Sequence, residues 1–322
     1  MTTCDLIGIL QQDPTALACQ KLESVDVAIV DSGIDATHER LQGRVCSAVA
    51  CHSFSTDFPP QMLPAATPGN NDPSGHGTAV CGIVTAIAPN ARIHDVRILD
   101  NNGGCSGEML LSGLDYGISK GFRIINMSLS CNKRFAPKLS ELCEKAYRSG
   151  TIIVAAKRNV PLSDDLGFPA EHSSCISVDN AIGSGLPYMA NYTNDRTIEF
   201  EAYGNALLVP KAGGGYTRFT GTSFATPSVT GIISLFLGIN PNLTLFELKT
   251  VLKHLRDTRP WAWAINPLEN HRANIDQAQN GPGFEQLRHF ICPKCKTRLT
   301  IPSVFRFSTC PVCEHIAEHD VR

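Results

Sequence analysis

The fold of this chain is constrained most by a repeated alternation of short apolar runs with segments of helical periodicity. Residues 25–30 form the first apolar run, and others follow at 93–99, 122–129, 151–155 and 175–178. Runs that are nearly continuous, and do not alternate with polar residues, are typical of strands buried on both faces of a parallel sheet. We therefore expect an α/β fold with a mostly parallel sheet and helices on both of its faces.

The segments between these runs carry helical patterns. Residues 108–120 and 138–148 each place apolar side chains on one face of a helix. Gly121 and Gly150 follow them, where a helix C-cap is expected. Residues 59–73 are rich in Pro, Ala, Gly and Asn, and this composition predicts an exposed loop.

The 322 residues are enough for one large domain and a small appendage. An amphipathic helix is expected over 244–256, and a stretch rich in Pro, Asn and Gly follows it. We predict a main domain over 25–282, a short preceding segment over 1–24, and a small second domain over 283–322.

Cysteine usage bears on the cellular compartment. Of 13 cysteines, four form two C-x-x-C pairs near the C-terminus, and the remaining nine are scattered singly. The first 20 residues lack the basic and apolar parts of a secretory signal. An odd, scattered set of cysteines without such a signal is typical of reduced thiols, so we expect a cytoplasmic location.

The net charge of −2 gives no indication of a nucleic-acid partner. No apolar window reaches the roughly 20 residues that would predict a membrane span.

Two motifs place proton-transfer groups next to these elements. Asp31 ends the first apolar run, at the carboxyl edge of a sheet where open α/β folds place their sites. His76 lies between Gly75 and Gly77 at the start of a helix of small residues, and an imidazole there can accept a proton near neutral pH. Taken alone, the first can be a turn residue and the second a surface or core histidine.

A third motif places Ser223 two residues after Gly221, at the start of a long helix that is expected to reach about residue 237. Pro227 is compatible with the first helical turn. The unpaired N–H groups of that turn suit an oxyanion that forms beside the serine. An ordinary N-cap serine is the alternative for this motif alone.

The order Asp, His, Ser along the chain is that of the subtilisin arrangement, and each motif closely resembles the corresponding signature of the subtilase family. The resemblance extends over about residues 25–279. It implies a subtilisin-like fold and a serine endopeptidase that acts on proteins or peptides. Asp31, His76 and Ser223 would be its catalytic triad.

The resemblance also implies a second oxyanion donor. The family places an asparagine after a strand that ends in a V-A-A-x-x-N pattern, and residues 154–159 match this pattern with Asn159 at its end. Lys157 and Arg158 stand where the family has a small residue and a glycine. An ordinary loop asparagine is the alternative for Asn159.

Two further segments resemble the edges that bind an extended substrate by strand addition. Residues 125–130 resemble the family's I-N-M-S-L-G segment, which makes Ser128, Leu129 and Ser130 candidate substrate-binding residues. The opposing edge would contain Gly103 and Gly104.

The primary specificity pocket would contain Gly167 and Arg158. Gly167 begins a segment similar to the family's G-Y-P-A/G sequence, and Arg158 takes the place of a glycine that lines the pocket. A guanidinium at this position would favour an acidic side chain before the scissile bond, or narrow the pocket for small residues. The alternative is that Arg158 turns outward to solvent.

Metal expectations differ between the two ends of the chain. Arg40 lies where the family often has an acidic calcium ligand, and a cation is unsuited to that role, so we predict no calcium. The two C-P-x-C pairs are separated by 14 residues and predict a structural zinc ribbon; a disulfide or redox pair is the alternative. The four ligands would be Cys292, Cys295, Cys310 and Cys313.

The ribbon would recruit substrate or a protein partner. Residues 283–322 contain six basic and four acidic residues, and four thiolates with one Zn²⁺ bring this total to about zero, which disfavours nucleic-acid binding. We interpret the chain as a cytoplasmic processing protease for a specific partner or precursor peptide. The alternative is a pseudoprotease that binds peptides while the ribbon docks a partner.

Overall fold

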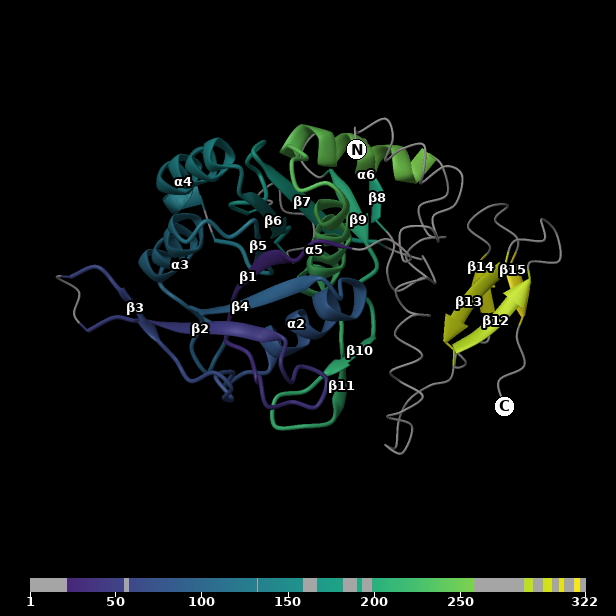
Figure 1. Ribbon diagram of the computed structural model, residues 1–322, viewed down its shortest axis with the longest axis horizontal. Helices are drawn as coiled ribbons and strands as arrows, with labels where there is room; N and C mark the ends of the chain where they lie inside the picture. Colours follow the sequence, from purple (N-terminus) through teal and green to yellow (C-terminus); the bar gives the residue numbers. More distant parts are fainter. Residues whose placement is uncertain are drawn as a thin grey trace.

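A computed structural model of the chain describes residues 22–54, 58–131, 133–158, 167–181, 190–192 and 199–257, together with the C-terminal strand segments 287–291, 298–302, 307–309 and 316–318. Most of these residues form a layered α/β body around one large sheet (Figure 1).

Within the described residues, the large sheet has nine strands in the order β3-β2-β4-β1-β5-β6-β7-β9-β8. In chain order the strands are β1 (Val25–Asp31), β2 (Val45–His52), β3 (Gln61–Pro64), β4 (Ala91–Arg97), β5 (Ile124–Met127), β6 (Ile152–Ala156), β7 (Cys175–Asn180), β8 (Ala190–Tyr192) and β9 (Phe200–Ala202). In this order, all neighbouring strands between β2 and β9 are parallel to each other. β3 at one end of the order and β8 at the other are antiparallel to their neighbours. The predicted parallel sheet is thus confirmed, and each predicted run corresponds to one of its strands.

β1 lies in the interior of the sheet between β4 and β5. Its residues 27–30 are fully buried because their side chains alternate between two cores. Val27 and Ile29 join the core on one face, whereas Ala28 and Val30 join the core on the other. This double coverage is the physical reason why the strand is apolar along its whole length.

Helices cover both faces of the sheet, as expected (Figure 1). Helices α2 (His76–Ile87), α5 (Thr222–Ile239) and α6 (Leu245–Asp257) contribute to the first core. Helices α3 (Gly107–Ser119) and α4 (Ala136–Ser149) contribute to the second. The glycine prediction is also confirmed: Gly150 is the C-cap of α4 with φ 77°, and Gly121 follows the C-cap of α3 with φ 71°.

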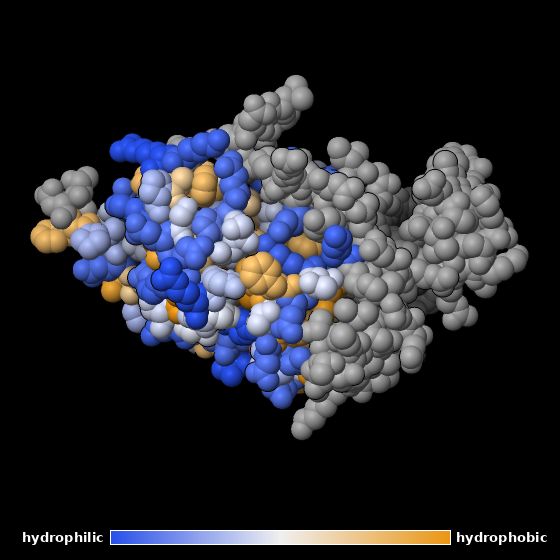
Figure 2. Space-filling view, turned by 90° about the horizontal axis from the view of Figure 1, so that it is seen from above, coloured by the Kyte–Doolittle hydropathy of each residue, from blue (hydrophilic) through white to orange (hydrophobic). Residues whose placement is uncertain are grey.

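The expectation of a loop over residues 59–73 was wrong in part, because β3 lies within it and pairs with β2. Most of the side chains of β3 are exposed, so its sequence lacks the apolar run that marks a covered strand. Phe54 and Phe58, in the connection between these two strands, are each 70% exposed, and hydrophobic surface is visible at this end of the molecule in Figure 2.

α5 packs as a core helix. Among the described residues it is the one helix long and apolar enough to cross a membrane, but 89% of it is buried inside the protein.

Next in the chain before α5, β10 (Leu207–Pro210) and β11 (Tyr216–Phe219) form an antiparallel hairpin. On α5, the fully buried hydroxyls of Thr226 and Thr230 donate hydrogen bonds to the backbone carbonyl of Thr222 and to Asn126 Oδ1, respectively.

The C-terminal segments contain two antiparallel strand pairs. β12 (Leu287–Ile291) pairs with β13 (Arg298–Pro302), and β14 (Phe307–Thr309) pairs with β15 (Ile316–Glu318). The four predicted zinc ligands, Cys292, Cys295, Cys310 and Cys313, lie outside the described residues.

Candidate active site

Asp31 is the last residue of β1 and is fully buried. Its carboxylate Oδ1 accepts a hydrogen bond of 2.7 Å from the backbone N–H of Ser32. Its backbone carbonyl accepts hydrogen bonds from Ile98 and Leu99, which follow the neighbouring strand β4. The carboxylate is therefore fixed at the carboxyl edge of the sheet, as the sequence predicts.

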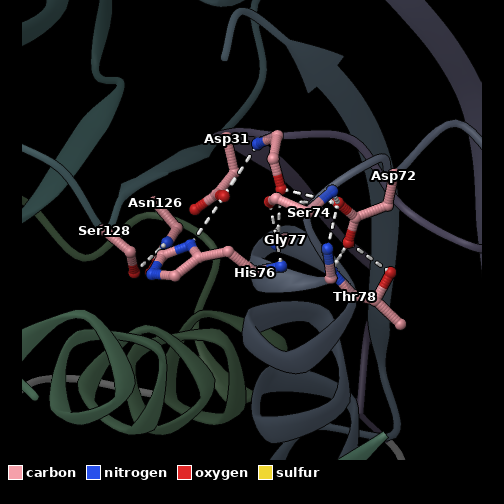
Figure 3. Close-up of polar contacts among 10 residues, drawn as sticks. Asp31, Asp72, Ser74, His76, Gly77, Thr78, Asn126 and Ser128 are labelled. Atoms are coloured by element: carbon pink, nitrogen blue, oxygen red, sulfur yellow. Dashed lines mark hydrogen bonds and ion pairs between the residues drawn. The ribbon is translucent and has the colours of Figure 1, made fainter. Parts of the chain in front are cut away.

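His76 is the first residue of α2, and its ring faces Asp31 (Figure 3). The distance from His76 Nδ1 to Asp31 Oδ1 is 2.7 Å, and the histidine side chain is 27% exposed. Gly77 allows this approach: a Cβ there would lie 2.2 Å from the carbonyl oxygen of Gly33. Only glycine can bring the helix start this close to the end of β1.

Asp72 organises the start of α2 from the side opposite Asp31 (Figure 3). Its Oδ1 accepts hydrogen bonds from the Ser32 hydroxyl at 2.7 Å and the Gly75 N–H at 2.8 Å. Its Oδ2 accepts from the Thr78 N–H at 2.8 Å and the Thr78 hydroxyl at 2.6 Å. Asp72 thus links the residue after Asp31 to the residues on both sides of His76. Nothing in the sequence marks Asp72, since an acid in a polar segment gives no signal of its own.

The charges around His76 shift its proton equilibrium. Burial lowers the pKa of the imidazole, but the negative charge of Asp31, the hydrogen bond to Asp31 and the more distant charge of Asp72 together outweigh burial. The pKa of His76 is therefore raised above its ordinary value. This environment stabilises the imidazolium that a general base forms when it accepts a proton.

Ser223 lies in the first turn of α5. Gly221, just before the helix, has φ 150°, a conformation that side chains disfavour. The hydroxyl of Thr222 donates a hydrogen bond of 2.7 Å to the carbonyl of Lys157, the residue that follows β6. The ring of Phe224 lies 5.1 Å from the ring of His76, measured between centroids.

These contacts place the N-terminus of α5 against His76, so the structure brings all three motif residues to one edge of the sheet. The described residues contain no hydrogen bond between the Ser223 hydroxyl and the imidazole. Such bonds are often long in ligand-free sites and shorten when substrate binds.

The predicted substrate edges follow the two strands that flank β1. Ser128, Leu129 and Ser130 follow β5, whereas Gly103 and Gly104 lie in the turn after β4. Because the sheet order is β4-β1-β5, the two edges emerge on either side of Asp31. Ser128 is 2% exposed and accepts a hydrogen bond of 3.0 Å from the Asn126 amide, which fixes the first residue of its edge.

The predicted pocket residues are also close together. A Cβ on Gly167 would lie 2.8 Å from the Cβ of Ser130 and 3.3 Å from the Cβ of Arg158. Residues 131 and 168 exchange two backbone hydrogen bonds, of 2.9 and 3.1 Å, which hold the two segments side by side. Asn159 lies outside the described residues.

The chain matches a known protein family and several known proteins. The family model described as peptidase S8, subtilase family, matches residues 23–279. Subtilisin E of Bacillus subtilis (strain 168) is 30% identical over 260 residues, covering 76% of this chain and 64% of that protein. An intracellular serine protease of Paenibacillus polymyxa is 30% identical over 226 residues, 66% of each chain. The solved structure of a cold-adapted subtilisin-like serine proteinase gives a TM-score of 0.58 at 25% identity, over 71% of this chain and 80% of that one.

Proposed function

The chain belongs to the subtilase family, and from this premise we propose that it is a serine endopeptidase with Asp31, His76 and Ser223 as its catalytic triad. The observation that carries the proposal is the 2.7 Å contact between His76 Nδ1 and the buried carboxylate of Asp31. This contact leaves Nε2 as the nitrogen that can accept a proton. A buried carboxylate in this position selects the productive tautomer and stabilises the cation.

The reaction follows from these roles. His76 accepts the proton of the Ser223 hydroxyl while the oxygen of that hydroxyl attacks the carbonyl carbon of the scissile peptide bond. The same imidazole returns the proton to the leaving amine, and a water molecule then hydrolyses the acyl-enzyme. The N–H of Ser223 and the amide of Asn159 would bind the oxyanion, and losing one such donor costs about 3 kcal/mol in transition-state stabilisation.

The substrate would be an extended peptide that lies between the two edges. Backbone groups of Ser128–Ser130 and of the turn at Gly103–Gly104 would pair with it by strand addition. Arg158 and Gly167 would line the pocket for the side chain before the scissile bond. This assignment is supported by the proximity of Gly167 to Ser130 and Arg158.

The biological role we propose is that of a cytoplasmic processing protease for a specific partner or precursor peptide. The location is supported by the scattered cysteines, since the seven that lie within the described residues are free thiols. It is further supported by the similarity to an enzyme that is itself described as an intracellular serine protease.

We also propose that residues 25–282 form the peptidase domain and that residues 283–322 form a structural zinc ribbon. In sequence, the pair Cys292–Cys295 lies between β12 and β13, and the pair Cys310–Cys313 lies between β14 and β15. Two antiparallel strand pairs, each joined by a C-x-x-C turn, are the expected topology of a ribbon with four thiolate ligands. The ribbon would dock the substrate protein or a partner.

Labelling by a fluorophosphonate probe tests the central proposal, because the probe reacts with an activated serine. We expect the wild type and a Ser119→Ala control to be labelled, and Ser223→Ala to remain unlabelled. Ser119 is an exposed serine at the end of α3, so it matches the chemistry of the change without touching the site. A folded wild type that resists labelling would refute the peptidase assignment and favour a peptide-binding pseudoprotease.

A further inference from the structure

A second group of reactive side chains lies at the edge formed by the amino ends of the parallel strands, whereas Asp31 lies at the edge formed by their carboxyl ends. Cys143 belongs to α4, His172 lies in the turn before β7, and Cys175 is the first residue of β7. Asp31 ends a strand of the same parallel sheet, whereas Cys175 begins one, so the cluster is separate from the candidate active site.

The three side chains converge on one point. The two sulfur atoms are 3.5 Å apart, and the ligand atoms of all three residues lie within 4.8 Å of one another. Two thiolates bound to one tetrahedral Zn²⁺ at about 2.3 Å would be separated by about 3.8 Å. The sulfur separation is therefore already close to that of a metal site.

The sequence spacing and the local turn are also those of a metal knuckle. His172 and Cys175 are separated by two residues, and the N–H of Cys175 donates a hydrogen bond of 2.9 Å to the carbonyl of His172. A carboxylate oxygen of Glu144 lies 3.8 Å from Nε2, which leaves Nδ1 as the metal ligand, and the ion would replace the 3.2 Å hydrogen bond that Nδ1 accepts from the backbone N–H of Ser174. A carboxylate beside the imidazole is a common partner of metal-binding histidines.

Burial and charge favour a divalent ion. Cys143 and Cys175 are 0% and 1% exposed, and their two thiolates with one divalent cation and a neutral imidazole have no net charge. A neutral assembly avoids the cost of burying an isolated charge. The imidazole of His172 is 15% exposed, which gives the ion a path from solvent.

We propose that Cys143, His172 and Cys175 bind a divalent metal ion of the zinc type, with water as the remaining ligand. Sulfur and imidazole ligands are those that Zn²⁺ prefers. Binding would replace the two thiol protons by two metal–sulfur bonds and release both protons to solvent. The site would join α4 to β7 and so brace the sheet far from the chemistry.

Zinc content and zinc affinity of the full chain test this proposal. We expect the wild type to hold one more zinc per chain than His172→Asn, Cys143→Ala or Cys175→Ala after equilibration with zinc under reducing conditions. His172→Asn keeps both thiols and changes a partly exposed side chain, so it is the variant with the least effect on folding. Cys46→Ala, at an exposed cysteine on β2, is the matched control and should retain the wild-type content.

A second measurement separates the site from the predicted ribbon. With Co²⁺ as the probe, wild type minus His172→Asn should give the absorption of a centre with two thiolates, not four. Glu144→Gln should weaken zinc binding at the site by about tenfold or more. Equal zinc content and affinity in wild type and His172→Asn would overturn the proposal. A Cys143–Cys175 disulfide in the protein purified without reductant, with no gain of zinc on reduction, would overturn it in favour of a redox pair.

Discussion

The hydroxyl of Thr222 donates a 2.7 Å hydrogen bond to the backbone carbonyl of Lys157. This bond links the residue before Ser223 to the residue that follows β6, and Thr222 is only 3% exposed. The position of the proposed nucleophile is therefore set by a contact between segments that are 65 residues apart.

Replacing Thr222 by valine should weaken this link without changing the volume of the side chain. The partly buried carbonyl of Lys157 would lose its donor, which costs about 1 kcal/mol of folding stability. The rate of labelling by a fluorophosphonate should fall as well, because Ser223 is held less firmly. Thr222→Ser keeps the hydroxyl and should behave like the wild type; equal losses in both variants would contradict this role.

The raised pKa of His76 predicts the acidic limb of the activity profile. The imidazole must be unprotonated to accept the serine proton, so kcat/KM should rise with pH through a pKa above the ordinary value of about 6.5. Asp72→Asn removes one of the charges that raise this pKa, and the limb should move to lower pH. Measuring kcat/KM against pH for both proteins checks the shift, and an unchanged limb would exclude an electrostatic effect of Asp72.

We expect the buried carboxyl of Asp95 to make the folded protein less stable as the pH rises. Burial raises the pKa of this β4 carboxyl to about 8, assisted by the charges of Asp72 and Asp31 and opposed by hydrogen bonds from Ile34 and Asn71. Between the unfolded pKa of 3.8 and about 8 the folded protein holds a proton that the unfolded chain has lost. Stability from this group is therefore complete below pH 3.8 and is lost as pH rises through about 8.

Asp95→Asn should remove this part of the pH dependence, because asparagine resembles the neutral acid. The free energy of unfolding, measured with urea from pH 5 to 8.5, should fall less steeply with pH in the variant. One proton of difference corresponds to at most about 1.4 kcal/mol per pH unit. If the free energy of unfolding fell equally steeply with pH in the two proteins, Asp95 would have the same pKa in the folded and the unfolded state.

Arg158 predicts a restricted cleavage specificity. A guanidinium in the pocket would favour acidic or small side chains before the scissile bond. Cleavage of a peptide library should show this preference in the wild type, and Arg158→Gly should shift it towards large apolar side chains. A wild type that already prefers large apolar residues would place the guanidinium outside the pocket.

We expect the proposed C-terminal ribbon to require zinc and the reaction at Ser223 not to require it. Changing Cys292 and Cys295 to serine should remove one zinc per chain, since a four-thiolate site does not survive the loss of two ligands. Labelling of Ser223 by the probe should persist, because the metal takes no part in the chemistry. Loss of labelling together with the zinc would show that the ribbon supports the fold of the peptidase domain.

Sequence patterns were sufficient where the determinants are local. The strands β1 and β4 to β7 could be predicted because both of their faces are buried, and the glycines at 121 and 150 because a helix end needs a left-handed residue. The motifs around Asp31, His76 and Ser223 likewise carry their signal within a few adjacent residues. The edge strand β3 could not be found in this way, since its side chains are mostly exposed.

The tertiary structure alone decided which distant groups meet. Asp72 contacts Ser32, 40 residues away, and Cys143 approaches Cys175 across 32 residues. Neither pair has a spacing or a flanking pattern that marks it, because each contact depends on how the sheet orders its strands and on which face each helix covers. The sequence by itself thus determined the buried strands of the sheet interior and the chemical groups of the proposed reaction. The packing of those elements determined the hydrogen-bond network around His76 and the second cluster at the opposite edge.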